Sequence, residues 1–299
     1  MAADTSELMS HVKDADYFHL PFGMEISLPN YGVVEVLPSW SVPSWSIFGS
    51  KVGGFDVPAF EITLKLTKFM ALELVAAVLI ILIFVPLARR IATGERPRGL
   101  FWNFFESMLL FIRDDVARPA IGKKDADKFL PFIWTIFFFV LFCNLLGMIP
   151  WAGSPTGALG TTAALAMMTF CTVVGAGMMK FGPVRFWTGQ VPHMELPLVM
   201  AIFIKPMVFA IEVMGMGIKH FVLSVRLLAN MFAGHLVLAV ILGFIAQTAE
   251  AGLVWYGVMP AAVFGSVALS LLELFVAFLQ AYIFAFLSAL FIGMAVHQH

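Results

Sequence analysis

The chain has 299 residues, of which 61% are hydrophobic and only 12% are charged, and its mean hydropathy is +0.93. A soluble domain of this length is not so apolar, and the net charge of −1 excludes the basic surface of a nucleic-acid-binding protein. Residues 1–128 hold 28 of the 37 charged residues, whereas residues 129–299 hold only nine. Apolar runs in the second part exceed the roughly 18 residues that mark a bilayer span, so the sequence predicts a polytopic membrane protein.

The first part of the chain divides into an extramembrane segment, a span and a basic region. Proline and glycine interrupt residues 1–68, which carry four lysines and eight acidic residues, so we expect this segment to lie outside the membrane. The first span is expected over residues 69–88. Residues 89–128 then carry nine lysines and arginines, which by the positive-inside rule places them on the inner side and the N-terminus on the outer side.

An amphipathic helix is expected within the basic region. Over residues 100–116, large apolar side chains recur every three or four positions, with polar residues such as Asn103 and Glu106 among them. This spacing is typical of a helix that lies in the membrane interface. A helix that packs against the soluble part of a partner subunit has the same pattern and remains an alternative.

The region 129–182 predicts a transmembrane hairpin. Its two spans, residues 129–150 and 160–181, are separated by a short turn that contains glycine and proline. The second span is rich in glycine, alanine and threonine, the small residues that allow helices to approach closely. Lys180 then marks the return of the chain to the inner side.

The region 194–296 predicts two very long helices. Its first apolar run, residues 194–249, would be about 84 Å long as one helix, whereas the bilayer core is about 30 Å thick. Pro197 and Pro206 can kink or break it, and the remainder must be strongly tilted or lie partly along the membrane. With the second run, residues 253–296, the fold class is all-α: five membrane-crossing helices, an interfacial helix, and two long tilted helices paired as an antiparallel hairpin, with the C-terminus inside.

We expect no disulfide, cofactor or metal site. Cys143 and Cys171 both lie inside apolar runs and are expected to pack as small hydrophobic side chains. A haem site is unsupported because the long apolar segments contain only His220 and His235, both on one helix. No phosphate-binding loop occurs in the sequence, so ATP chemistry would belong to other chains, and this chain would not be an enzyme by itself.

Arg226 is the most informative residue in the apolar part of the chain. An ionisable side chain in the bilayer costs about 2.5–3.5 kcal/mol on insertion scales and usually marks a functional site. Arginine cannot lose its proton, so Arg226 must face water, a carboxylate, or both. A rotation of about 100° per residue places five others on the same helix face, namely Glu212, Gly215, Lys219, Asn230 and Ala233. His235 lies about 180° from Arg226, on the opposite side.

The last helix, expected over residues 253–296, carries a matching polar stripe, which we call the polar seam. Its members lie within about 60° of one direction, and they are Ser266, Ser270, Glu273, Ala277 and Gln280. If the two long helices are antiparallel, His235 faces this seam. A glutamate and a histidine in contact could hold and relay protons near neutral pH, because histidine titrates in that range.

Structural roles are the alternatives for these residues. Lys219, like other cations near the helix ends, can extend to the membrane surface without any transport role. Asn230 and Gln280 can form hydrogen bonds that only hold helices together. Glu273 and Arg226 can likewise be structural ion partners, although the cost of burying them favours function.

The residues around Arg226 resemble one known family, subunit a of the F-type ATP synthase. The resemblance rests on the block RLLANMFAGH and on the acidic and amide residues spaced around it, namely Arg226–His235, Glu212, Glu273 and Gln280. The segment 144–150, NLLGMIP, is similar to the hairpin motif of that family. Together these motifs cover roughly residues 69–296, and the arginine block is the most specific of them.

The resemblance implies a role for each matching position. The counterpart of Arg226 stands between two offset aqueous half-channels and faces the essential carboxylate of a rotating ring of c subunits. The outer-side access path would consist of Asn230, His235, Glu273 and Gln280, and the inner-side exit of Glu212 and Lys219. The implied partners are the c ring, the peripheral-stalk b subunits, other ATP synthase subunits and membrane lipid.

Two features depart from the family pattern or stay open. His220 stands where many members have a proline, which questions a local kink at that point. No role carries over from the family to residues 1–68, so their role stays open. His235 paired with Glu273 is the arrangement that resembles mitochondrial members, so a mitochondrial inner membrane is the alternative to a bacterial inner membrane.

A self-contained transporter or channel is the competing class of function. Such a protein would need its own substrate cavity, and many transporters show two similar halves with interrupted helices, which this sequence lacks. The sequence leaves H⁺ and Na⁺ open as the transported ion, although a histidine and glutamate relay favours H⁺.

Overall fold

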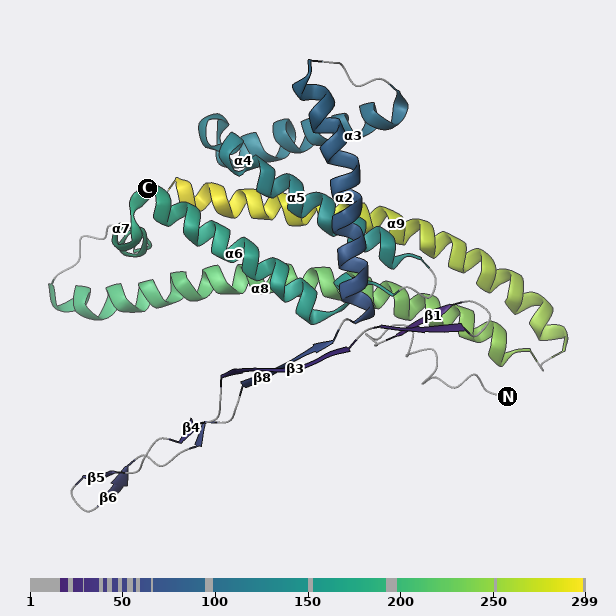
Figure 1. The fold of residues 1–299 in the computed structure, drawn as a ribbon, viewed down its shortest axis with the longest axis horizontal. Coiled ribbons are helices and arrows are strands. Elements are labelled where there is room, and N and C mark those ends of the chain that lie inside the picture. The colour runs from purple at the N-terminus through teal and green to yellow at the C-terminus, as the bar shows by residue number, and fades with distance from the viewer. Residues whose placement is uncertain are drawn as a thin grey trace.

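A computed structural model gives the fold of the chain (Figure 1). The residues that it describes are 17–20, 24–28, 30–37, 40–41, 45–47, 50–52, 56–57, 60–65, 67–94, 99–149, 153–191, 198–249 and 252–297.

Short strands occupy the segment before the first span. They are β1 (Tyr17–Leu20), β2 (Met24–Ser27), β3 (Asn30–Leu37), β4 (Trp40–Ser41), β5 (Trp45–Ile47), β6 (Ser50–Val52), β7 (Asp56–Val57) and β8 (Phe60–Lys65). The pairs β3–β8, β4–β7 and β5–β6 are antiparallel and nested, so the chain runs out and back as one long hairpin (Figure 1). The alternation of apolar and polar residues in β8 suits a strand, but from the sequence we predict only an extramembrane segment here.

Five helices in the described part of the chain are long and apolar enough to cross a membrane. They are α2 (Lys68–Ala92), α5 (Lys123–Gly147), α6 (Leu159–Phe181), α8 (Leu198–Gln247) and α9 (Leu253–Val296). The shorter elements are α3 (Leu100–Phe111), the π-helical turn η1 (Ile112–Ala117), α4 (Arg118–Ile121), the 3-10 turn η2 (Pro155–Gly157) and α7 (Pro183–Thr188). The predicted all-α polytopic class with five crossing helices is confirmed, and the strands are an addition to it.

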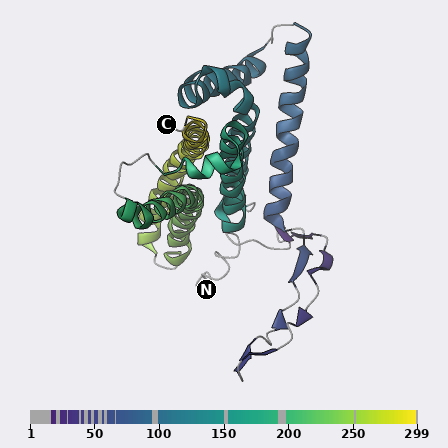
Figure 2. The ribbon, with the colours of Figure 1, turned by 90° about the vertical axis from the view of Figure 1, so that its left-hand side faces the viewer.

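The two longest helices lie across the direction of the first span. In Figure 1, α2 stands upright while α8 and α9 run side by side and nearly horizontally. Figure 2 shows α2 on the outside of the bundle, where it packs against α5. Helices α5 and α6 pack against α9, and α6 also packs against α8. The predicted pair of long, strongly tilted helices is therefore confirmed.

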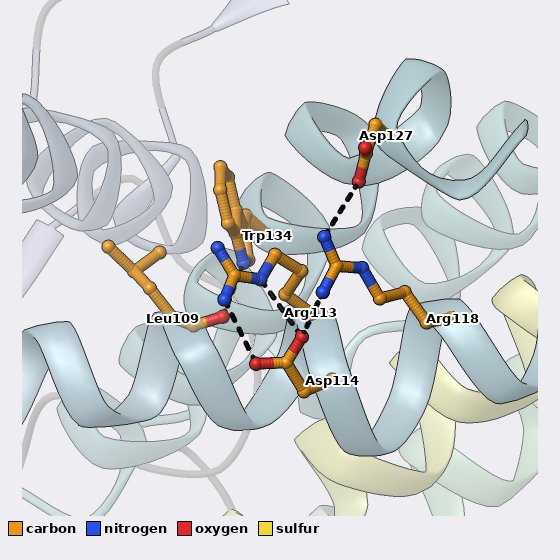
Figure 3. Close-up of polar contacts among 6 residues, drawn as sticks. All are labelled: Leu109, Arg113, Asp114, Arg118, Asp127 and Trp134. Atoms are coloured by element: carbon orange, nitrogen blue, oxygen red, sulfur yellow. Dashed lines mark hydrogen bonds and ion pairs between the residues drawn. The ribbon is translucent and has the colours of Figure 1, made fainter. Parts of the chain in front are cut away.

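The interfacial helix α3 is attached to the bundle by aromatic contacts. The ring of Phe84 on α2 lies 5.6 Å from the ring of Phe105 on α3 and 4.3 Å from that of Phe138 on α5. The indole nitrogen of Trp134 on α5 donates a hydrogen bond of 3.0 Å to the carbonyl oxygen of Leu109 (Figure 3). The other face of α3 exposes large apolar side chains, as a helix at the membrane surface would.

The helix predicted over residues 100–116 changes its geometry at Ile112. From Ile112 to Ala117 the chain forms a π turn, which is wider than an α turn. Ile112, Val116 and Ala117 are all fully buried in this turn, so the altered geometry brings all three into the core.

Exposed ion pairs connect this turn to the start of α5 (Figure 3). Arg113 contacts Asp114 through two hydrogen bonds of 3.0 Å each, and Arg118 donates to the same carboxylate at 2.6 Å. Arg118 also lies 3.7 Å from Asp127. The hydrogen bonds from Arg113 hold the pKa of Asp114 below its usual value, so this carboxylate stays charged around neutral pH.

Helix α5 begins six residues before the predicted start of its span. Gly122, with φ of 90°, precedes the helix, and Asp125 in the first turn lies 2.7 Å from Lys180 of α6 and 3.0 Å from Lys128. Hydropathy does not detect this polar turn, although the ion pairs stabilise it. They also join the first turn of α5 to the last turn of α6.

Helix α8 is continuous through Pro206. A break at this position, which the sequence allows, is therefore absent, although a proline in a helix removes one backbone hydrogen bond. Pro197, the other expected kink, lies outside the described residues.

Candidate functional site

Polar contacts between α8 and α9 centre on His235. Its Nδ1 lies 2.8 Å from the carbonyl oxygen of Met231 and 3.1 Å from Oε1 of Glu273, and its Nε2 lies 2.8 Å from the carbonyl oxygen of Gly147. Because both ring nitrogens face oxygen acceptors, a proton on each nitrogen supplies a donor for these contacts. The two side chains are 17% and 8% exposed, so the pair can exchange a proton largely out of bulk water.

The contact of His235 with Glu273 is the one that antiparallel pairing predicts, and its role as a proton relay stays a prediction. Gly234 allows the close approach, because a Cβ atom at this position would lie 2.8 Å from Oε1 of Glu273. A glycine in the middle of a helix is otherwise unfavourable by roughly 0.5–1 kcal/mol relative to alanine, so its position here has a packing reason.

Asn230 and Gln280 form the second contact between the two helices. Nδ2 of Asn230 donates a hydrogen bond of 2.7 Å to Oε1 of Gln280. A rotation of 100° per residue separates Asn230 from His235 by about 140° on α8, yet both side chains reach α9. Asn230 thus reaches Gln280 from the Arg226 side of α8, because the two amide side chains are long enough to meet beside the helix contact, and this is the interhelical hydrogen bond that the sequence allows for the pair.

A buried network attaches the turn after α5 to α9. Asn144 donates to the carbonyl oxygen of Ala277 at 3.2 Å and accepts from the hydroxyl of Thr156 at 2.7 Å, and Thr156 lies 2.8 Å from the hydroxyl of Ser154. Gly147 packs so closely on Ser154 that an added Cβ would lie 2.5 Å from its hydroxyl oxygen. The motif of residues 144–150 thus positions the Gly147 carbonyl that contacts His235.

Arg226 stands apart from these contacts. In the described part of the chain, its half-buried side chain has no hydrogen-bond or ion-pair partner. Leu223 and Leu227 beside it are fully buried in the bundle, whereas Val222 is 45% exposed. Arg226 therefore lies at the boundary between the packed face and the open face of α8, where a group from another chain can reach it.

Glu212 and Lys219 line a separate cavity of about 160 Å³, together with Gln190 and, at the C-terminal end of α9, Met294 and Ala295. Neither charged side chain has an ion-pair or hydrogen-bond partner within the described ranges. Glu212 lies about 21 Å from Arg226 along the helix, at 1.5 Å per residue. The structure thus places the expected access residues and the expected exit residues in two groups, and Arg226 lies between them along α8.

Some polar residues at these helix contacts were not among the site residues predicted from the sequence. Glu73 on α2 accepts a hydrogen bond of 2.6 Å from Thr161 on α6, and Ser224 donates to Thr162 at 3.1 Å. Glu73 lies within the first span, so a carboxylate in an apolar run was available as a signal. Asn144 carried the weaker signal of the hairpin motif. No group of three or more potential metal-binding side chains occurs in the described residues.

The comparisons with known proteins decide the family. The sequence profile of the ATP synthase A chain family matches residues 70–293. The chain belongs to this family. ATP synthase subunit a of Myxococcus xanthus is 40% identical over 79% of this chain and 75% of its own length. The subunits of the same name are 37% identical in Chloroherpeton thalassium, over 78% of this chain and 67% of theirs, and 38% identical in Anaeromyxobacter dehalogenans (strain 2CP-C), over 78% and 58%.

Membership in the ATP synthase A chain family makes the chain a subunit of an ATP synthase complex, whose other subunits are its partners. Five apolar helices and bacterial relatives fit a multi-pass protein of a bacterial membrane. The profile begins at residue 70, so the strands of residues 17–65 lie outside the part that defines the family.

Gly234→Ala is expected to displace the Glu273 carboxylate from His235, because the added methyl group would stand 2.8 Å from Oε1. We expect the rate of ATP synthesis by the assembled complex to fall severalfold while the amount of complex stays unchanged. Gly265→Ala is the matched control, since an added Cβ there meets no atom within 4 Å. Equal rates in the two variants would show that this close approach has no part in function.

Proposed function

We propose that the chain is the proton-translocating stator subunit of a rotary F-type ATP synthase, with no nucleotide site of its own. One arrangement carries the proposal. His235 and Glu273 lie in contact beyond one side of Arg226, Glu212 lines a cavity beyond the other side, and Arg226 has no partner among the described residues. Two proton paths that stop at opposite sides of a fixed charge are the elements of a pair of offset half-channels.

The charge of Arg226 explains why proton flow would require a moving carrier. A fixed positive charge in a low-dielectric slot lowers the pKa of a carboxylate brought close to it, which favours release of the proton. The same charge opposes a proton that moves straight from one half-channel to the other. A carboxylate on a ring of c subunits must bind a proton before it crosses lipid, because the neutral form has a much lower free energy in lipid than the charged form. Proton flow is then coupled to rotation.

The ends of the α5–α6 hairpin support opposite openings for the two paths. The first turn of α5 contacts Lys180 at the end of α6, and the last residue of α5, Gly147, contacts His235. With the basic region inside, the path through Asn230, His235, Glu273 and Gln280 opens to the outer side, and Glu212 with Lys219 forms the exit on the inner side. The N-terminus then lies outside and the C-terminus inside.

The open face of α8 suits contact with the c ring. Only 6% of the most apolar stretch of α8 is buried within the chain, against 56% for α5. Large apolar side chains on this face, such as Ile211 and Ile218, are more than half exposed, and an added Cβ at Gly215 meets nothing within 4 Å. Small residues let a neighbouring helix approach closely. The exposed apolar side chains of α2 leave a separate surface for the peripheral-stalk b subunits.

Disulfide crosslinking tests the ring-facing surface. Cysteine at Gly215 or Ala233, in a chain whose own Cys143 and Cys171 have been replaced, is expected to crosslink to a cysteine placed beside the carboxylate of the ring subunit. Cysteine at Ser224, which is buried against α6, is the matched control and is expected to give no product. Crosslinks from a cysteine on the His235 face but not from Ala233 would mean that the ring contacts a different face of α8.

A further inference from the structure

His220 is a buried histidine of α8 that the proposed proton paths do not use. Its side chain is 4% exposed and lies between the rings of Phe170 on α6 and Phe291 on α9, at centroid distances of 5.2 and 5.0 Å. Its Nδ1 lies 2.9 Å from the carbonyl oxygen of Met216. Because a carbonyl oxygen only accepts, Nδ1 must carry the proton in this contact.

The other ring nitrogen is left as a base. In the neutral ring, a proton on Nδ1 leaves Nε2 as a lone pair that can accept a hydrogen bond or a proton. Within the described part of the chain this buried atom has no hydrogen-bond partner. Buried polar atoms almost always have a partner, so an orphaned one indicates a bound water molecule or a proton-transfer role.

Cavities lie on two sides of the His220 side chain. One cavity of about 430 Å³ lies between α6 and α8 and is lined by His220 and Ser224. The other is the cavity of about 160 Å³ that Glu212 and Lys219 line, and His220 is part of its wall as well. A water molecule occupies about 30 Å³ in the liquid, so the smaller cavity, which has charged and amide groups in its wall, has room for several, whereas the wall of the larger one is mostly apolar. His220 is the one residue that the two linings share.

The position of His220 along α8 fits a gap in the proposed exit path. Glu212 and Arg226 are about 21 Å apart along the helix, whereas direct proton transfer needs heavy atoms about 2.6–3.2 Å apart, or one bridging water. His220 lies about 12 Å from Glu212 and about 9 Å from Arg226 along the axis, which divides the distance into two shorter steps.

We propose that His220 is the proton relay of the inner-side exit, between the Arg226 region and Glu212. A proton that arrives through water binds Nε2 and forms the imidazolium, while Nδ1 keeps its proton on the Met216 carbonyl. The same Nε2 proton then leaves to water in the smaller cavity and passes to the Glu212 carboxylate, which returns the ring to its neutral form. The inference rests on the proposed proton-translocating function and adds a residue to it.

The charged groups around His220 allow this cycle. Glu212 and Lys219 are the charged residues in the linings of the two cavities, and they act in opposite directions on the imidazolium. Gln190 adds a neutral polar group, whereas α6 and α9 present apolar side chains, namely Val173, Phe291, Met294 and Ala295. Glu212 therefore attracts the proton toward the exit, and the positive charge of Lys219 promotes its release from His220.

The test uses membranes that contain the assembled complex with its catalytic sector stripped off, and it measures passive proton conductance with a pH-sensitive dye. His220→Phe keeps an aromatic ring between Phe170 and Phe291, and His220→Gln keeps a polar side chain, but neither carries a titratable base. Conductance is expected to fall about tenfold in both variants, with the chain present at its normal level. Normal conductance in His220→Phe would overturn the relay and leave His220 as a packing residue.

Chemical rescue separates a proton carrier from a filler of space. In His220→Ala, imidazole added on the inner side is expected to restore conductance severalfold, whereas pyrrole, which has a similar shape but no basic nitrogen, is not. Equal effects of imidazole and pyrrole would contradict the relay. Glu273→Gln in the same membranes tests the proposed function itself. If Glu273→Gln loses conductance while His220→Phe keeps full conductance, only the relay is rejected. If both variants keep full conductance, the proton path is rejected.

Discussion

Arg226→Ala is expected to abolish proton-driven ATP synthesis by the assembled complex, with a loss of about a hundredfold or more. Without the fixed charge, nothing lowers the pKa of a ring carboxylate at this point, so the carboxylate keeps its proton. Protons can then also pass between the half-channels without rotation. The measurement is the rate of ATP synthesis in membrane vesicles under an imposed proton gradient.

Arg185→Ala is the matched control for this experiment. Arg185 is an exposed residue of the short helix α7, outside both groups of site residues, and its loss is expected to leave synthesis near the normal rate. The level of Arg226→Ala in the purified complex must equal that of the unchanged chain. ATP synthesis at the normal rate in Arg226→Ala would reject the assignment of this residue to the coupling step.

Glu273→Gln and His235→Ala are each expected to lower passive proton conductance about tenfold or more, because each removes one titratable member of the pair. Glutamine keeps the size and hydrogen-bonding capacity of Glu273 but cannot carry a proton, so packing is preserved. The measurement is proton flux into vesicles that contain the complex without its catalytic sector. Ser270→Ala on the polar seam is the control, since its hydroxyl bonds only to the Ser266 carbonyl in the described structure.

An exchange of the two residues gives a second, independent readout. The double variant His235→Glu with Glu273→His keeps one carboxyl group and one imidazole in contact, so we expect it to recover part of the conductance that either single change removes. A double variant with less flux than both single variants, together with normal flux in Glu273→Gln, would mean that the pair only holds the helices together.

The membrane part of the fold was predictable because a helix that spans the bilayer needs a long apolar segment, and hydropathy detects such segments. The apolar run predicted over residues 253–296 has the same bounds as helix α9, Leu253–Val296. At α5 the same reasoning fails for the first six residues, since ion pairs from Asp125 stabilise a turn that hydropathy assigns to a loop. The strands of residues 17–65 were missed because most of them have only two to four residues, too few for a clear alternation such as that of β8.

The site was predictable where it depends on helix phase and missed where it depends on tertiary contacts. His235 and Glu273 meet because antiparallel helices bring a polar seam against the opposite side of α8. Asn230 lies on the Arg226 side of α8 by helix phase and still reaches Gln280 on α9, because its side chain is long enough. The buried network of Asn144 and the orphaned nitrogen of His220 depend on which helices pack together, which no local pattern contains.

Labelling of single cysteines from either side of the membrane is the most direct test of the central claim, that two half-channels open to opposite sides of Arg226. Lys219→Cys and Asn230→Cys suit this test because they lie on the same face of α8, on either side of the arginine. In chains without Cys143 and Cys171, a membrane-impermeant thiol reagent is predicted to label Asn230→Cys only from the outer side and Lys219→Cys only from the inner side. Labelling of both cysteines from the same side would contradict the account.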